Sequence, residues 1–383
     1  MINAKGAAAH SWEWGGSGYN IAMRQPHSRL AAFLIVFVVA QFAFASAKQH
    51  LKHPDEWYRS DEGKRIAANI LSQQSDLGGW PKNVETAEQP YAGKREDLKP
   101  TFDNGATTDE LRFLARAHRA TGEDRYKQAF LKGYDYILKA QYPTGGWPQF
   151  YPPDKAYHRH ITFNDNAMVR LMDFLRETYT GDDHPLLDAD RKRAARVEFD
   201  RGVACILKCQ IAVDGRLTAW CAQHDEIDYS PRPARAFELV SLSGSESVGI
   251  SRLLMSLDEP SPEVVRAVRA AVAWFESAKL TGIKVVVQPD PTAPKGTNKV
   301  VLADPAAPPL WARFYDIKTN KPFFCDRDGV AKPNLADIGS ERRNGYAWYG
   351  VWPQALLEKE YPAWKAKWAD RVAAAEKGDS QAK

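Results

Sequence analysis

Apolar residues along most of this chain recur at helical spacing and mark pairs of helices joined by short turns. In the stretch 107–141, one apolar stripe ends at a Thr-Gly-Glu turn and a second stripe follows it. The ranges 167–208 and 245–282 repeat this plan, whereas strand-like alternation is scarce outside 283–288. The pattern therefore predicts an all-α domain built from helical hairpins.

Two sequence motifs repeat along the chain. GGWP occurs at 78–81 and at 145–148, and TFDNGAT at 101–107 is echoed by TFNDNAM at 162–168. The third helical pair is expected to lack the Trp loop but keeps a glutamine at Gln210. Helical hairpins that cannot bury their faces alone must stack or close on one another. An open α-solenoid is the alternative, but its repeats would be shorter and its loops simpler, so we expect a short (α/α)3-type toroid.

The segment 285–350 breaks the helical pattern. It is rich in Pro, Gly, Asn and Asp, and a long irregular segment inside a compact domain usually has a function. We expect it to lie across one mouth of the toroid, so that long irregular loops line a central groove.

The N-terminus reads as a secretory signal. The apolar run 30–45 is shorter than the roughly 20 residues that a membrane helix needs, and Arg24 and Arg29 precede it. A small-x-small sequence ends at Ala47, so we predict a signal peptide over residues 1–47, with Met23 as an alternative start. An uncleaved anchor is the competing interpretation.

The remaining chain, 48–383, is then expected to form a single domain with a flexible tail from about residue 370. We expect a secreted or periplasmic monomer with no membrane attachment after cleavage of the signal. The 383-residue chain has a formal net charge of +4, which gives no reason to expect a nucleic-acid partner.

The cysteines do not form a metal-binding pattern. They stand at positions 205, 209, 221 and 325 without a CxxC pair, which argues against a zinc site. An oxidising compartment permits disulfides, and a Cys209–Cys221 bridge is one possibility that spacing alone does not decide.

Two acidic pairs related by the repeat carry the first candidate chemistry. Asp103-Asn104 and Asp165-Asn166 each directly precede a predicted helix, so simple N-capping is one interpretation. In a closed toroid the two pairs would share one rim, where their oxygens would suit Ca²⁺. The two carboxylates could equally form the acid and base of a glycoside hydrolase.

Arginines gather in the loops that follow. Arg235 lies in the loop before the third hairpin, Arg327 stands between two aspartates, and Arg342 and Arg343 precede Tyr346. Forked guanidinium groups suit bidentate recognition of carboxylates. A neutral polysaccharide would not need so many cations, so an acidic sugar chain is the favoured ligand.

At this point the chain resembles the pectate lyases of polysaccharide lyase family 10 from about Trp57 to Trp352. The segments that carry the resemblance are, in order, GGWPKN, TFDNGATTDELRFLARA, GGWPQFYP, ITFNDNAM, WCAQHDEIDYSPRPARAFE, SGSES, WARFYDI, FFCDRDG and ERRNGYAWYG. The resemblance implies a short α/α toroid with a wide groove and Ca²⁺-dependent β-elimination of polygalacturonate to unsaturated oligogalacturonides.

The resemblance also implies roles for residues. Arg327 is predicted to be the catalytic base, although an arginine needs crowding by other cations and alkaline pH to lose its proton. Asp103 and Asp165 are predicted to bind Ca²⁺. The predicted substrate ligands are Asn104, Arg235, Arg342, Arg343 and Tyr346.

Two other functions remain open. An inverting glycoside hydrolase would use Asp103 and Asp165 as acid and base, but it would leave the arginines unexplained. A non-catalytic pectin-binding protein would keep the arginines but would not need Arg327 as a base.

Overall fold

The structure is a computed structural model that describes residues 47–181 and 186–381. The chain divides into two units, 1–43 and 44–383, and the fold reported below is that of the second. The predicted signal peptide lies outside the described residues, except for its last residue, Ala47. Among the described residues, no helix is long and apolar enough to cross a membrane.

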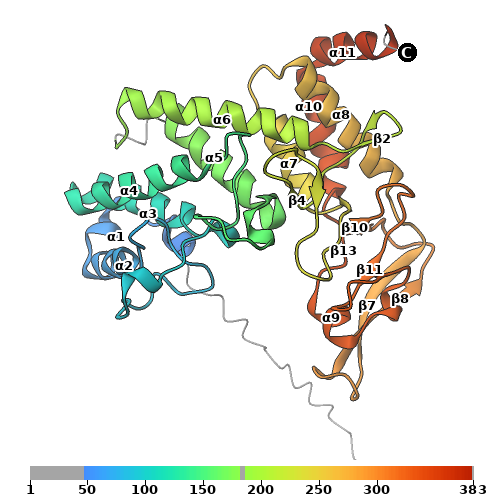
Figure 1. The fold of residues 1–383 in the computed structure, drawn as a ribbon, viewed down its shortest axis with the longest axis horizontal. Coiled ribbons are helices and arrows are strands. Elements are labelled where there is room, and N and C mark those ends of the chain that lie inside the picture. The colour runs from blue at the N-terminus through green and yellow to red at the C-terminus, as the bar shows by residue number, and fades with distance from the viewer. Residues whose placement is uncertain (1–46, 182–185, 382–383) are drawn as a thin grey trace, which may run out of the picture. The chain divides into compact units, whose positions relative to one another are not determined.

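Helical hairpins follow one another along the chain (Figure 1). They are α1 (Asp55–Arg59) with α2 (Asp61–Ser72), α3 (Thr108–Thr121) with α4 (Asp124–Ala140), α5 (Ala167–Thr180) with α6 (Ala189–Cys209), and α7 (Glu246–Met255) with α8 (Pro262–Ser277). The three hairpins predicted from apolar spacing are confirmed, and the short pair α1 and α2 precedes them.

A buried tryptophan locks each of three hairpins. The indole Nε1 atoms of Trp80 and Trp147 each donate to the carbonyl oxygen ten residues earlier, at 2.7 and 2.9 Å. Trp220 makes the same kind of bond to the Ile206 carbonyl at 2.8 Å. The expectation that the third pair lacks a Trp loop was therefore wrong, because Trp220 fills this place without the flanking glycines.

A glutamine shortly after each of α2, α4 and α6 hydrogen-bonds the second helix of the next hairpin. Gln141 Nε2, after α4, donates to the carbonyls of Gly145 and of Glu198 in α6, at 2.8 and 2.9 Å. Gln74 and Gln210 make equivalent pairs of bonds toward α4 and α8. These amides satisfy buried carbonyls that would otherwise cost free energy, and they fix the order α2–α4–α6–α8.

The strands are short and antiparallel. They form a three-stranded sheet of β1 (Ile161–Thr162), β4 (Gln223–His224) and β5 (Pro231–Arg232), and the pairs β2 (Ala212–Val213) with β3 (Arg216–Leu217), β6 (Leu242–Ser243) with β10 (Phe314–Tyr315), β9 (Trp311–Ala312) with β13 (Tyr349–Gly350), β11 (Phe324–Cys325) with β12 (Ala331–Lys332), and β7 (Ile283–Pro289) with β8 (Thr297–Ala303). The predicted strand at 283–288 is thus one arm of a hairpin.

The irregular segment 285–350 has its own small core. Phe237, Phe314, Phe324 and Trp348 are buried together in a cluster separate from the main helical core. Aromatic side chains bury large areas and favour edge-on or offset contacts, so this cluster can hold loops that lack regular structure. Tyr346 packs against this cluster, and the Arg342 guanidinium lies over the Phe237 ring, so the cluster holds both side chains in place.

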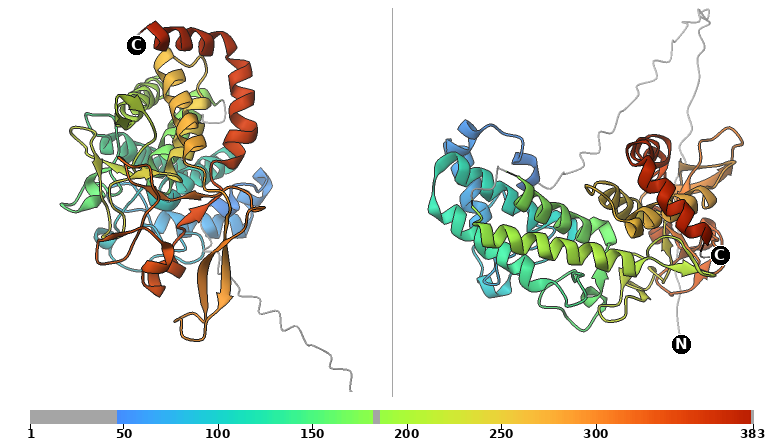
Figure 2. Two further views of the ribbon diagram at one scale, coloured as in Figure 1. Left: turned by 90° about the vertical axis from the view of Figure 1, so that its right-hand side faces the viewer. Right: turned by 90° about the horizontal axis from the view of Figure 1, so that it is seen from above.

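The C-terminal residues form helices. After a π-helical turn (Leu356–Glu360), α10 (Tyr361–Lys367) and α11 (Ala369–Gln381) follow, and α11 contacts α8 (Figure 2). Val372 and Ala375 are buried. The stretch that was predicted to be a flexible tail from about residue 370 is therefore helical as far as Gln381.

All four cysteines are buried free thiols. Cys205 and Cys209 lie one helical turn apart with their Sγ atoms at 4.0 Å. The suggested Cys209–Cys221 bridge is not formed in this structure.

Candidate functional site

The two repeated acidic motifs form adjacent turns. They are the 3-10 turns η3 (Asp103–Gly105) and η5 (Asn164–Asn166), and Cα atoms of the two approach within 8 Å. Asn104 and Asp165 both take left-handed backbone conformations, with φ of 56° and 50°. Asn104 and Asp165 are therefore equivalent in the repeat, and Asp103 corresponds to Asn164. The first turn has the carboxylate before the amide, and the second turn has the amide before the carboxylate.

Neither acidic residue caps the helix that follows it. The residue before α3 is Thr107 and the residue before α5 is Asn166, and neither side chain accepts a hydrogen bond from its helix. The N-capping interpretation of Asp103 and Asp165 is wrong, and both carboxylates are available for other contacts.

Asp103 lies almost fully buried, with 3% of its surface exposed. Its Oδ2 accepts hydrogen bonds from Lys82 Nζ and from Gln149 Nε2, the latter at 2.7 Å. Its Oδ1 is buried without a partner. An unsatisfied buried acceptor costs about 1–3 kcal/mol, so this oxygen suits a ligand that arrives from outside the chain.

Asp165 is more open, with 44% of its side chain exposed. Its Oδ2 accepts from Asn164 Nδ2 at 2.8 Å, and its Oδ1 lies 3.4 Å from Arg313 Nη2. Arg313 is nearly buried and is also paired with Glu246 at the start of α7. Arg313 and Glu246 were not assigned to the site from the sequence, although they lie within the WARFYDI and SGSES segments.

Arg235 and Tyr346 meet at a buried carboxylate. Arg235 Nε donates to Glu238 Oε2 at 2.7 Å, and the Tyr346 hydroxyl donates to Glu238 Oε1 at 2.8 Å. The Tyr346 ring centroid lies 5.9 Å from the Arg235 guanidinium and 4.9 Å from that of Arg313. Tyr346 thus links Arg235 to the arginine that contacts Asp165.

The charges in this group reinforce one another. Hydrogen bonding to Glu238 raises the pKa of Arg235. Burial acts to raise the pKa of Glu238, but Arg235 outweighs it and the net shift is downward. Burial raises the pKa of Tyr157, while Arg235 acts to lower it.

Arg327 and Arg342 share a second carboxylate, Glu341. Arg327 is 64% exposed and binds Glu341 through two bonds of 2.8 and 2.9 Å. Arg342 Nη2 donates to Glu341 at 2.6 Å, and its guanidinium lies 4.6 Å from the Phe237 ring centroid. Hydrogen bonds from Arg327 and then Arg342 lower the pKa of Glu341 to about 2.

Arg327 lies within electrostatic reach of Arg235, which acts to lower its pKa, although the hydrogen bond to Glu341 raises it overall. Arg235 and Arg342 lie over the same Phe237 ring, with their guanidinium groups 4.8 and 4.6 Å from its centroid. Since Arg342 and Arg327 share Glu341, the three arginines belong to one group. Arg343 does not join them, because its guanidinium bonds Asn298 instead. Asn104 lies exposed at the rim, with Nδ2 3.4 Å from Asn83 Oδ1.

Behind Asp103, a cavity of about 250 Å³ is lined partly by Glu110 of α3. Glu110 accepts a hydrogen bond from the Thr86 hydroxyl at 2.8 Å, and its other oxygen has no partner. Burial raises the pKa of Glu110 from 4.5 to about 7. The folded state therefore holds this proton more tightly than the unfolded chain does.

We expect this carboxyl to make stability depend on pH. Its contribution is complete below about pH 4.5 and is lost as pH rises through about 7, at a cost of roughly 3 kcal/mol in the free energy of unfolding. Glu110→Gln should remove that loss between pH 5 and 8, as measured by urea denaturation in EDTA. The exposed Glu276→Gln variant is the control and should keep the wild-type pH dependence. An unchanged pH dependence in Glu110→Gln would contradict the assignment.

A different acidic cluster also has ligand atoms close enough for a metal. His160, Asp225 and Glu226 offer atoms that all lie within 4.8 Å of one another. However, Arg159 binds Glu226 at 2.9 Å and Arg232 binds Asp225 at 2.8 Å. Asp103 and Asp165 are also paired with cations, Lys82 and Arg313. What distinguishes them is the Oδ1 atom of Asp103, a buried carboxylate oxygen without a partner, and we therefore prefer the two turns as the cation site.

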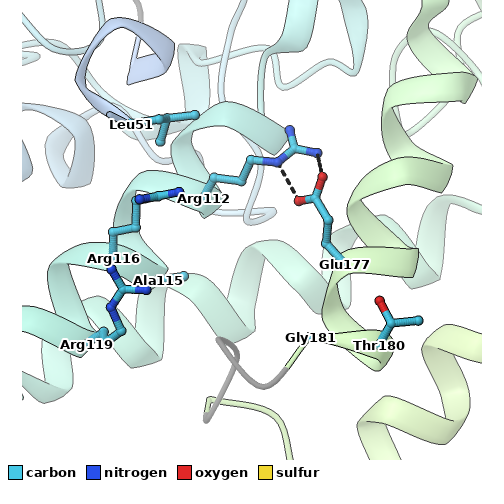
Figure 3. Close-up of a pocket in the computed structure, with 8 residues that line it drawn as sticks. All are labelled: Leu51, Arg112, Ala115, Arg116, Arg119, Glu177, Thr180 and Gly181. Atoms are coloured by element: carbon cyan, nitrogen blue, oxygen red, sulfur yellow. Dashed lines mark hydrogen bonds and ion pairs between the residues drawn. The ribbon is translucent and has the colours of Figure 1, made fainter. Parts of the chain in front are cut away.

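A basic hollow lies along the later turns of α3 (Figure 3). Arg112 binds Glu177 of α5 through two bonds of 2.7 and 2.9 Å, and Arg119 binds Asp55 at 2.8 Å. These arginines serve to join helices, and the hollow does not include the acidic turns. The candidate site is therefore the space between those turns and the group around Arg235.

Comparisons with known proteins identify relatives of this architecture. The family model described as pectic acid lyase matches residues 74–357. A solved family 10 polysaccharide lyase from Cellvibrio cellulosa is 35% identical, with a TM-score of 0.70 over 82% of this chain and 95% of the other. A mutant of family 10 polysaccharide lyase from the same organism, in complex with trigalacturonic acid, is also 35% identical, with a TM-score of 0.69 over 81% and 95%. No curated protein matches the chain.

Proposed function

Because the chain belongs to the pectic acid lyase family, we propose that it cleaves polygalacturonate by Ca²⁺-dependent β-elimination and releases 4,5-unsaturated oligogalacturonides. The observation that carries this proposal is the placement of two acidic turns beside a group of arginines. The trigalacturonic acid in a similar solved structure supports the choice of substrate. Enzymes of this family are polysaccharide lyases, so the inverting hydrolase is the weaker alternative.

Asp103 and Asp165 are the residues that would hold Ca²⁺. The free buried Oδ1 of Asp103 and the exposed carboxylate of Asp165 fit a hard cation that prefers oxygen ligands. When bound, the ion would help to neutralise the uronate carboxylate and make the neighbouring carbon more acidic.

The arginines would bind the same carboxylate and the adjoining sugars. Arg235 and Arg327 are each held now by a glutamate, which is the chemical group that a uronate would replace or join. Arg342 lies against Phe237 and keeps its Nε atom unpartnered. Guanidinium groups fixed in this way stabilise charge that develops as the proton leaves.

The proton must be taken by a residue near the acidic turns, and we propose Arg235. It lies next to Tyr346, which also contacts Arg313 beside Asp165. The sequence-based prediction assigns this role to Arg327, whose guanidinium is more exposed and is paired with Glu341. Arg327 then remains the competing candidate, and in our proposal it binds substrate.

We also propose that the hairpins close into the short α/α toroid and that the mature protein is secreted or periplasmic. The glutamine ties between successive outer helices support regular stacking of the hairpins. The signal peptide predicted at 1–47 supports this proposal. An extracellular or periplasmic location would give the enzyme access to pectin.

The test is incubation with polygalacturonate while ultraviolet absorbance is followed. A lyase creates a conjugated double bond and the absorbance rises, whereas a hydrolase or a pectin-binding protein gives no rise. EDTA should abolish the signal and added Ca²⁺ should restore it. Full activity in EDTA would contradict the role of the metal, and absence of any absorbance would contradict the lyase.

Substrate charge gives a second prediction. Methyl esterification removes the carboxylate that both the cation and the arginines would bind, so highly esterified pectin should be cleaved at least about tenfold more slowly than polygalacturonate. The measurement is initial rate at equal uronate concentration, and enzymatic de-esterification of the same pectin is the control that should restore the rate. Equal rates on both polymers would be inconsistent with carboxylate recognition.

A further inference from the structure

A second cavity, of about 520 Å³, lies beside the β7–β8 hairpin. Its walls come from β8, from the 3-10 turn η6 (Leu335–Asp337) and from the segment that includes α9 (Ser340–Gly345). Figure 1 shows β7, β8 and α9 close together, and β8 contacts both α9 and η6. The cavity shares no lining residue with the acidic turns.

Two cations line this cavity without a carboxylate partner. Lys299 Nζ donates to the carbonyl of Tyr346 at 3.0 Å, and no carboxylate among the described residues pairs with it. Arg343 donates through Nε to Asn298 at 2.8 Å and through Nη1 to the carbonyls of Ala336 and Ile338 at 3.1 and 2.9 Å. Its Nη2 has no hydrogen-bond partner within the described ranges.

The acids nearest to this pair do not neutralise it. Asp337 accepts a hydrogen bond from Asn334 at 2.9 Å, and the exposed Asp290 lies within electrostatic reach of Arg343 without forming an ion pair. Burial lowers the pKa of Lys299, and Lys295 adds repulsion. Half-buried cations held only by neutral acceptors are costly to keep, which distinguishes this cavity from the hollow on α3, where Arg112 and Arg119 have acidic partners.

The remaining walls suit a sugar ring. Asn298 and Asn334 line the cavity, and so does the half-buried Tyr349, whose ring is an apolar group. Amides that hydrogen-bond hydroxyls and an aromatic ring that packs against a sugar face are the usual means of holding a carbohydrate. The combination with two unpaired cations fits a sugar that carries a carboxylate.

We propose that this cavity is a second carbohydrate site, which binds a galacturonate residue of the polymer through Lys299 and Arg343 and shares no lining residue with the acidic turns. The choice of ligand rests on the proposed function. A chain held at two places is kept at a high effective concentration near the acidic turns. The site would therefore strengthen binding of long polygalacturonate and have no effect on a trimer that occupies the cleavage site alone.

The experiment compares Lys299→Gln with Lys284→Gln in the full chain. Lys284 lies on the same hairpin, so its variant removes the same charge from the same element. It is a suitable control because it is paired with Asp304 at 3.0 Å and does not line the cavity. For Lys299→Gln we expect KM for polygalacturonate to rise about 3- to 10-fold, the loss of one charged contact. Its kcat and KM for trigalacturonate should stay at wild-type values, and Lys284→Gln should match wild type on both substrates.

A binding measurement separates this proposal from the proposed function. In EDTA, retention of the protein in a gel that contains polygalacturonate should fall for Lys299→Gln and not for Lys284→Gln, whether or not the protein is a lyase. Retention by polyglutamate, a polyanion without sugar rings, should be weak and equal in all three proteins. An equal loss of retention on both polymers would overturn the sugar site in favour of unspecific charge.

One other result would overturn the proposal. Lys299 also bonds the backbone of Tyr346, whose ring contacts Arg235 and Arg313. If Lys299→Gln acts only by displacing Tyr346, kcat on trigalacturonate should fall as much as on the polymer, and gel retention should stay at the wild-type level.

Discussion

Replacing Arg235 by alanine should lower kcat on polygalacturonate by about 10²- to 10⁴-fold, the usual cost of removing a general base. The reason is its position, since the guanidinium lies beside Tyr346, and Tyr346 in turn lies against the arginine that contacts Asp165. Added Ca²⁺ should not restore the rate. Arg235→Lys should be nearly as inactive, because lysine loses the planar fork that bonds Glu238.

If Arg327 is the base, as the sequence-based prediction has it, the same fall in kcat should appear in Arg327→Ala. In our proposal Arg327→Ala raises KM and leaves kcat within about tenfold of wild type, because an exposed residue that binds substrate contributes less to the chemical step than a base does. Steady-state kinetics on both variants decides between the two. A fall of kcat by more than 10²-fold in Arg327→Ala, with Arg235→Ala still active, would return the role of base to Arg327.

Arg232→Ala is the matched control for both variants. Arg232 lies three residues before Arg235 and pairs with Asp225, which is buried. Its removal breaks the same kind of arginine–carboxylate pair in the same loop, so any general damage to the loop would appear here too. We expect its turnover to remain within about twofold of wild type, because Asp225 keeps its hydrogen bonds from the Ile227 and Asp228 backbone N–H groups when the guanidinium is removed.

The proposed base also sets a direction for pH dependence. Hydrogen bonding to Glu238 raises the pKa of Arg235 in the free enzyme, so the guanidinium is protonated at neutral pH and its neutral fraction grows as pH increases. The rate should therefore rise through the alkaline range until the protein unfolds. A rate maximum near neutral pH would be inconsistent with an arginine base.

The helical plan could be predicted from the sequence because it depends on local patterns. Apolar spacing and the turn at Gly122, which takes a left-handed conformation with φ of 74°, are enough to define α3 and α4. The third Trp lock was missed because Trp220 lies in a WC sequence without the GGWP context. Its indole also bonds a carbonyl fourteen residues away and not ten.

The site was harder to predict because its contacts join distant segments. Arg313 reaches Glu246, 67 residues earlier, and Asp165, 148 residues earlier, and no spacing rule connects such positions. The exchange of carboxylate and amide between the two turns, by contrast, can be read from the repeat, because TFDNGAT and TFNDNAM align Asp103 with Asn164 and Asn104 with Asp165. Pairing the two Asp-Asn dipeptides treats Asp103 and Asp165 as equivalent, and the backbone conformations contradict this.

This exchange explains why the two acidic residues should respond differently to mutation. Asp103 is buried and already bonds Lys82 and Gln149, so Asp103→Ala leaves a lysine and an amide unpaired and should also lower stability. Asp165 is open, and among the described residues its side chain contacts its neighbour Asn164 and, at a longer distance, Arg313. Asp165 is therefore the better residue for testing the metal, because its loss disturbs the fold least.

Asp165→Ala should raise the Ca²⁺ concentration needed for half-maximal activity by about 10- to 100-fold, the scale on which metal affinity responds to damage of a site. Saturating Ca²⁺ should then restore most of kcat, because mass action offsets a loss of affinity. The same variant should lose the Ca²⁺-induced rise in melting temperature at low Ca²⁺, a measurement that needs no substrate. Asp154→Ala, in the loop between α4 and β1, is the control and should keep the wild-type Ca²⁺ requirement.

The rescue by Ca²⁺ is what separates a metal ligand from an acid or base. In an inverting hydrolase, Asp165 would transfer a proton or activate water, and no concentration of Ca²⁺ could replace its carboxylate. Activity of Asp165→Ala that stays lost at every Ca²⁺ concentration, with a melting temperature that still rises with Ca²⁺ as in wild type, would therefore rule out Asp165 as a ligand. If the Ca²⁺ requirement is shifted and kcat is recovered, Asp165 is not the base. An arginine then remains the candidate for removing the proton, in agreement with the two guanidinium groups that lie beside Tyr346.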